Sequence, residues 1–119
     1  MVFHQIKQRG DNFSYIIADE ATKEAAVVDP SFNVDAIIRL LTEEGLDLKY
    51  VVNTHHHTDH TAGNEELASH YRAKIVAHKL SRVRKDVVVN DGDLIQIGKI
   101  AIRVIHTPGS SLENAAEQI

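Results

Sequence analysis

The feature that most constrains this chain is an internal histidine-rich run, Thr54-His55-His56-His57-Thr58-Asp59-His60, which follows the apolar segment Tyr50-Val51-Val52. Histidine is the commonest nitrogen ligand of zinc and similar ions in proteins, and aspartate supplies an oxygen ligand. Histidine-rich tracts also occur as purification tags, but tags lie at chain termini and lack an interposed aspartate. An internal run that follows a strand-like segment is therefore interpreted as a metal site.

The spacing within the run predicts which side chains can share an ion. If residues 51–57 are extended, the two-residue period of a strand sends His55 and His57 to one face and His56 to the other. If the chain then turns into a helix near Asp59, the neighbours Asp59 and His60 can face the same cavity from another direction. These two ligand pairs are enough to begin two adjacent metal sites.

Composition limits the fold and its partners. A chain of 119 residues favours a single domain, and its formal net charge of −4 gives no basic field for nucleic acid. The chain has no cysteine, so nitrogen and oxygen must hold any metal. No apolar run approaches the roughly 20 residues that span a bilayer, and the N-terminus lacks a signal-peptide pattern. We therefore expect a cytoplasmic protein that binds neither nucleic acid nor membranes.

Hydrophobic periodicity and turn signals predict an α/β (α+β) fold in which strands outnumber helices. The expected strands are residues 2–6, 13–18, 25–28, 48–53, 74–77, 94–97 and 99–105. A first helix is expected over residues 34–44, capped by Asn33 and ended by Gly45. A second is expected to carry Glu65 and Glu66 in its first turn, with Leu67, Ala68 and Tyr71 on its inner face.

The order of these segments around the histidine run resembles the metallo-β-lactamase fold superfamily, and within it the hydroxyacylglutathione hydrolase-like branch. The segments that carry the resemblance are Gly10-Asp11-Asn12-Phe13-Ser14-Tyr15, Ala26-Val27-Val28-Asp29-Pro30, residues 53–64, Asp91-Gly92-Asp93 and Ile105-His106-Thr107-Pro108-Gly109. The resemblance covers residues 1–109 as the N-terminal half of such a domain and leaves residues 110–119 as a divergent C-terminal tail. It implies half of a four-layer αββα sandwich, with a mixed sheet and helices on one face.

The resemblance also implies roles for the run. His55 and His57 correspond to ligands of a first metal, and Asp59 and His60 to ligands of a second. The implied cofactor is zinc, as one or two ions, with iron or manganese as alternatives. In such enzymes a metal-bound hydroxide attacks a carbonyl, and Asp59 is the residue placed to orient it or accept its proton. The implied function is a metal-dependent hydrolase that cleaves small thioesters of the hydroxyacylglutathione type.

The sequence departs from the family pattern in two places. After Thr107-Pro108-Gly109 the family places a histidine, the third ligand of the first metal, whereas this chain has Ser110. The family's later bridging aspartate and final histidine do not occur before the sequence ends at Ile119. His106 is open as a substitute ligand. The alternative function is therefore a catalytically incomplete metal-binding or self-assembling half-domain.

The other histidines and Asp29 receive supporting interpretations. His56 is interpreted as a hydrogen-bonded support for a ligand or as a core residue. His4, His70 and His78 lie on unrelated predicted elements and are interpreted as structural or exposed. Asp29, which precedes Pro30, is expected to cap the turn beneath the site.

A half-sandwich raises the question of what covers the second face of its sheet. Helices on one side would leave the other side apolar and open to water. The apolar side chains for which we expect no partner within the chain are Phe13, Tyr15, Ile17, Ile100, Ile102 and Val104. We therefore expect a homodimer or a complementary C-terminal half to cover them.

Overall fold

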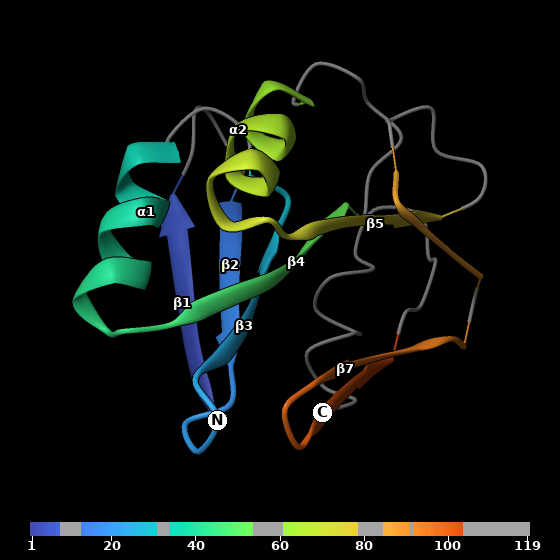
Figure 1. The fold of residues 1–119 in the computed structure, drawn as a ribbon. Coiled ribbons are helices and arrows are strands. Elements are labelled where there is room, and N and C mark those ends of the chain that lie inside the picture. The colour runs from blue at the N-terminus through green and yellow to red at the C-terminus, as the bar shows by residue number, and fades with distance from the viewer. Residues whose placement is uncertain (8–12, 31–33, 54–60, 79–84, 91, 104–119) are drawn as a thin grey trace.

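The computed structural model of this chain describes residues 1–7, 13–30, 34–53, 61–78, 85–90 and 92–103. These residues form a six-stranded mixed sheet, two helices and a separate two-stranded hairpin (Figure 1). The sheet runs in the order β1 (Val2–Lys7), β2 (Phe13–Ala18), β3 (Glu24–Val28), β4 (Asp47–Asn53), β5 (Lys74–His78) and β6 (Val87–Val89). The helices are α1 (Val34–Glu43) and α2 (Thr61–Tyr71), and the hairpin joins β7 (Leu94–Ile97) to β8 (Ile100–Arg103).

The sheet changes its pairing direction at β3. Strands β1, β2 and β3 pair antiparallel, whereas β3, β4, β5 and β6 pair parallel. Parallel neighbours need a crossover connection, and α1 lies in the chain between β3 and β4 as α2 does between β4 and β5. The predicted mixed α/β sheet is confirmed, and the helices pack on one face as predicted (Figure 1).

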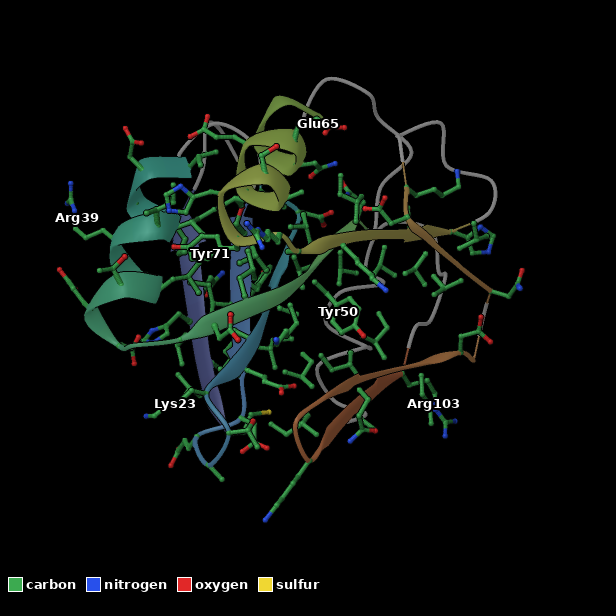
Figure 2. All side chains as sticks on the ribbon, in the orientation of Figure 1. Lys23, Arg39, Tyr50, Glu65, Tyr71 and Arg103 are labelled. Carbon is green, nitrogen blue, oxygen red and sulfur yellow. The ribbon has the colours of Figure 1, made fainter. Side chains whose placement is uncertain are left out.

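The helix-covered face forms the larger core. Alternate residues of the strands, including Ile16, Val27 and Ile75, are buried together with Ile37 of α1 and Leu67 of α2. Tyr71 of α2 packs against this cluster on the helix side of the sheet (Figure 2). Because strand side chains alternate between faces, the residues next to these in sequence must be buried on the other side of the sheet.

The opposite face is covered by the β7–β8 hairpin. Ile17, Val28 and Val76 of the sheet cluster with Ile97 and Ile102 of the hairpin, and all five are buried. Tyr50 of β4 lies on the hairpin side, between the sheet and the hairpin (Figure 2). Burying one such side chain stabilises the fold by roughly 1.5–3 kcal/mol.

This arrangement corrects one expectation. Ile17 and Ile102 were expected to lack a partner within the chain, but they are 0% and 5% exposed and belong to one intramolecular cluster. Ile100 and Tyr15 pack partly against the same cluster. The side chains of Phe13 and Val104 lie outside the described residues. The sequence argument missed the docking of the hairpin because it treated each amphipathic strand separately.

Two carboxylates, Asp19 just after β2 and Glu24 at the start of β3, hold the hairpin in place. Asp19 Oδ2 accepts a hydrogen bond from the backbone N–H of Lys99 at 2.7 Å, and Glu24 Oε1 accepts one from Gly98 N–H at 2.9 Å. Asp19 Oδ1 also accepts from Ala21 N–H at 2.9 Å. Because these backbone N–H groups favour the charged form, they lower the pKa of Asp19, with Lys99 the larger cause.

The ends of the helices agree only in part with the sequence prediction. Gly45 follows α1 with a φ of +64°, the left-handed conformation expected of a residue that ends a helix. The predicted start of α2 was wrong, since the helix begins at Thr61 and places Glu65 and Glu66 in its second turn. Leu67 and Ala68 are buried and Tyr71 is partly buried, as predicted. Strand β6 was not predicted.

Neither of the two helices that the structure describes is long and apolar enough to cross a membrane.

Candidate functional site

The histidine run connects two described elements of the fold. Strand β4 ends at Asn53 and helix α2 begins at Thr61, so the run connects the carboxyl end of β4 to the amino end of α2. Strands β3, β4, β5 and β6 are parallel, and their carboxyl ends therefore lie at the same edge. Open α/β sheets bind ligands at this edge.

The predicted ligands themselves lie outside the described residues. This applies to His55, His57, Asp59 and His60, to His56, and to His106 and Ser110. Their convergence on shared ions therefore stays a prediction. Among the residues that the structure does describe, no group of three or more His, Cys, Asp or Glu side chains could hold a metal ion.

Asp29 joins three strands beside the run. Its backbone N–H donates to the carbonyl of Val52 at 2.8 Å, and its carbonyl accepts from the buried hydroxyl of Ser14 at 2.6 Å. The φ of Asp29 is +52°, a left-handed conformation that costs roughly 1–3 kcal/mol in a residue other than glycine. These contacts fix the exit of β3 against the end of β4, in agreement with a supporting role for Asp29.

Two asparagines flank the run on its described sides. Within the described chain, the buried Nδ2 of Asn53 has no hydrogen-bond partner, and neither do Oδ1 and Nδ2 of Asn64. Asn64 is 1% exposed and sits in the first turn of α2. A buried polar group without a partner costs about 1–3 kcal/mol, so native proteins keep few of them. Sequence reasoning did not single out either residue.

The histidines outside the run were interpreted as structural or exposed. His4 on β1 forms an ion-pair contact with Glu44 after α1, and the exposed His70 packs its ring 4.6 Å from that of Tyr71. His78 is half-buried at the end of β5, where its neighbour Ala77 pairs with Asn53 of β4. The structure therefore places His78 at the same sheet edge as the carboxyl end of β4, which the run follows in sequence, although the sequence assigned His78 to an unrelated element.

A separate open cavity of about 330 Å³ lies at the far end of α2, lined by Ala68, Ser69, Arg72, Ala73, Lys74 and Asp86. Lys74 begins β5, whereas the run follows the carboxyl end of the neighbouring β4. Because β4 and β5 are parallel, the cavity lies at the edge of the sheet opposite to the carboxyl end of β4. The cavity is therefore not part of the candidate site.

Comparison with known proteins places this architecture in one class. Residues 8–112 match the family model described as the metallo-beta-lactamase superfamily. The fold, a mixed sheet with helices on one face and a hairpin on the other, is found in ETHE1 from Myxococcus xanthus with a TM-score of 0.82 and 32% identity over 92% of this chain. A metallo-beta-lactamase from Staphylococcus aureus aligns with a TM-score of 0.78 and 30% identity.

The same comparison identifies the similar sequences. The chain is 38% identical over 105 residues to a hydroxyacylglutathione hydrolase of Pelagibacter ubique and 37% identical over 118 residues to one of Rhodospirillum rubrum. These alignments cover 86% and 95% of this chain, but only 44% and 45% of the Pelagibacter and Rhodospirillum proteins. The chain also covers 49% of the Myxococcus chain and 35% of the Staphylococcus chain.

The chain belongs to the metallo-β-lactamase superfamily. It spans less than half the length of these curated relatives, and what it matches is their N-terminal half, as predicted.

Proposed function

We propose that this chain carries the metal-binding half of a metal-dependent hydrolase that cleaves small thioesters of the hydroxyacylglutathione type. The observation that carries the proposal is that the histidine run connects the carboxyl end of β4, at the edge where the parallel strands end, to the start of α2. The 38% and 37% identities to hydroxyacylglutathione hydrolases support the thioester class of substrate. The two relatives are each more than twice as long as the segment that matches this chain. Their length supports the proposal that a second half of the domain is needed, supplied by a second copy of the chain or by a complementary C-terminal segment.

The donor set of the run fits a divalent metal. His55 and His57 would hold one ion through nitrogen, and Asp59 and His60 would hold a second through oxygen and nitrogen. Zinc suits this mixture best, with iron or manganese as alternatives, because all three accept imidazole and carboxylate ligands. Among the described residues, the buried Nδ2 of Asn53 and both amide atoms of Asn64 have no hydrogen-bond partner, which fits a site with additional polar groups to satisfy.

When bound, such an ion supplies Lewis-acid chemistry: it polarises a carbonyl and makes water acidic enough to react near neutral pH. The residues of the chain then have separate tasks. Asp59 orients the attacking water and accepts its proton. Asp29 keeps the end of β4 in place through its hydrogen bond with Val52, which holds the start of the run at the sheet edge.

The test is hydrolysis of an acyl-glutathione thioester by the protein with added zinc. His55→Ala should abolish turnover, and His70→Ala is the matched control because His70 is exposed on α2. Turnover in the wild type that is lost only in His55→Ala supports the proposal. A wild type that binds zinc but does not hydrolyse thioesters contradicts the catalytic part for this polypeptide.

A second candidate function is a metal-binding module without turnover. Ser110 favours it, because a serine stands where the family pattern places the third ligand of the first metal. A catalytic zinc normally has three protein ligands and water. This candidate predicts that zinc raises the melting temperature while thioester hydrolysis stays at the rate of buffer with zinc. Recovery of turnover in Ser110→His would show that the missing ligand, rather than the substrate class, limits the reaction.

A further inference from the structure

Helices α1 and α2 end in the same hydrogen-bonded motif, but with different residues at its left-handed position. After α1 this residue is Gly45, with a φ of +64°, and the next N–H, that of Leu46, donates back into the last turn of α1 at 2.9 Å. After α2 it is Arg72, with a φ of +56°, and Ala73 N–H donates back into α2 at 3.0 Å. Glycine is the usual residue here because it has no Cβ. Arg72 therefore occupies a position at which the backbone favours glycine.

No contact within the described part of the chain explains this arginine. The side chain of Arg72 is exposed and makes no ion pair with any described residue. A cation near the C-terminal end of a helix interacts favourably with the helix dipole. Helix α1, however, has no basic residue in its last turn and ends at a glycine. The fold therefore tolerates a helix end without a cation, and the charge of Arg72 needs another explanation.

The cavity at the end of α2 supplies that explanation. Its volume is about 330 Å³, within the range of about 300–1,000 Å³ that is typical of small-molecule sites. Ala68 and Ala73 are its buried lining residues, and their short side chains leave the space open. The polar lining residues are Ser69, Arg72, Lys74 and Asp86. Arg72 thus lines a cavity of the size that ligands occupy.

The polar groups of the lining favour an anionic ligand. Arg72 and Lys74 are both cations, and neither has an ion-pair partner among the described residues. The carboxylate of Asp86 is engaged by the backbone, since its Oδ2 accepts a hydrogen bond from Ile75 N–H at 2.9 Å. Arginine, lysine and the hydroxyl of Ser69 offer more donors than a carboxylate can accept from, and they suit the several charged oxygens of a phosphate group.

We propose that the cavity at the end of α2 binds a small phosphorylated molecule, with Arg72 and Lys74 at its phosphate group. The cavity is larger than a phosphate ion, which leaves room for the organic part of the ligand beside Ala68 and Ala73. The cavity lies at the edge of the sheet opposite to the carboxyl end of β4, and its named lining residues all belong to the described part of the chain. The inference is therefore independent of the proposed metal-binding function.

The test is calorimetric titration of the protein with glycerol 3-phosphate, inorganic phosphate and acetate at constant ionic strength. We expect glycerol 3-phosphate to bind more tightly than inorganic phosphate, and acetate to show no binding. In Arg72→Gln the dissociation constant for glycerol 3-phosphate should rise roughly 10- to 100-fold, because hydrogen bonds from a charged donor are lost. Arg39→Gln is the matched control: Arg39 is exposed on the outer side of α1 (Figure 2), and its loss should leave the affinity within about twofold.

The melting temperature without ligand separates this role from a structural one. Arg72→Gly removes the strain of a left-handed residue with a Cβ, so it should raise the melting temperature by several degrees although it weakens binding as Arg72→Gln does. Lower melting temperatures in both variants with unchanged affinity would identify Arg72 as a structural end of the helix and overturn the proposal.

Three outcomes of the titrations would also overturn it. The first is that neither phosphate compound binds to the wild type. The second is equal affinity of Arg72→Gln and Arg39→Gln for glycerol 3-phosphate. The third is equal affinity of the wild type for acetate and for the phosphate compounds, which would show that the site does not select phosphate. Equal affinity for the two phosphate compounds would contradict the part of the proposal that concerns the organic part of the ligand.

Discussion

The carboxylate of Asp19 accepts a hydrogen bond from the backbone N–H of Lys99 across 2.7 Å, although the two residues are 80 positions apart in the sequence. This contact attaches the β7–β8 hairpin to the turn between β2 and β3. It is short and its acceptor is charged, and such bonds are stronger than those between neutral groups. The hairpin in turn covers the face of the sheet opposite the helices, so this contact, with that of Glu24 to Gly98 N–H, helps to hold a buried layer in place.

Asp19 should make stability depend on pH in the acidic range. Its pKa is lowered, mainly by Lys99 N–H and then by Ala21 N–H, so the folded state favours the ionised form. A group with a lowered folded-state pKa contributes stability that is fully present above its unfolded pKa of about 3.9 and is lost as the pH falls through the folded value. Asp19→Asn should therefore be less stable than the wild type at pH 7.

Urea unfolding midpoints from pH 7 down to pH 3 measure this contribution. The difference between the wild type and Asp19→Asn should narrow as the pH falls below about 4, because the unfolded wild type takes up a proton at Asp19 at a higher pH than the folded protein does. Asp93→Asn is a suitable control, since Asp93 is exposed and the bond that it accepts from Asn90 N–H at 2.7 Å is local. A difference between Asp19→Asn and the wild type that stays constant over this range would argue against the charged contact.

Gly98→Ala should destabilise the folded state more than Gly45→Ala does. Gly98 has a φ of +55°, and a Cβ there would lie 2.2 Å from Thr22 Oγ1 and 2.5 Å from Asp19 Oδ2. Gly45 has a similar φ of +64° but no atom within 4 Å of an added Cβ. The left-handed conformation costs roughly 1–2 kcal/mol in either alanine variant. The collision should add about 1–3 kcal/mol at Gly98 alone.

Thermal or urea unfolding of both glycine variants separates the cost of the left-handed backbone conformation from the cost of the steric clash at the added Cβ. We expect Gly45→Ala to show only the conformational cost and Gly98→Ala to show the larger loss. Equal losses in the two variants would mean that the hairpin can move away from the β2–β3 turn at little cost, which would contradict the tight attachment described above.

The two faces of the sheet should contribute comparably to stability. Ile37 of α1 and Ile97 of β7 are both fully buried, one in each core cluster. Each Ile→Ala substitution removes a fully buried side chain and should cost roughly 2–5 kcal/mol. Chemical denaturation of the two variants checks this. A loss at Ile37→Ala with almost none at Ile97→Ala would mean that the hairpin is not stably docked in solution.

Local patterns predicted the elements more successfully than their assembly. The strand over residues 13–18 was predicted with its observed ends, and most others to within one residue, because turn signals and alternation are local. Strand β6 was missed because its three valines are too few to show a period. The start of α2 was misplaced because the acidic pair Glu65 and Glu66 was taken to mark the first turn.

The docking of the hairpin could not have been predicted from local sequence. It depends on Asp19 and Glu24, whose partners Lys99 and Gly98 lie 80 and 74 residues away. Neither pair belongs to a recognisable motif. For the site, the sequence predicted the ligand run, whose residues lie outside the described part of the chain, whereas the buried amides of Asn53 and Asn64 were found only in the structure.

The most direct test of the central claim is the zinc content of the purified chain after exhaustive dialysis against metal-free buffer, measured by elemental analysis. The claim is that His55, His57, Asp59 and His60 hold divalent ions. It predicts about one to two zinc ions per chain in the wild type, and a clear loss of zinc in His55→Ala and in Asp59→Ala but not in His70→Ala. Negligible zinc in the wild type, or equal zinc content in all four proteins, would contradict it.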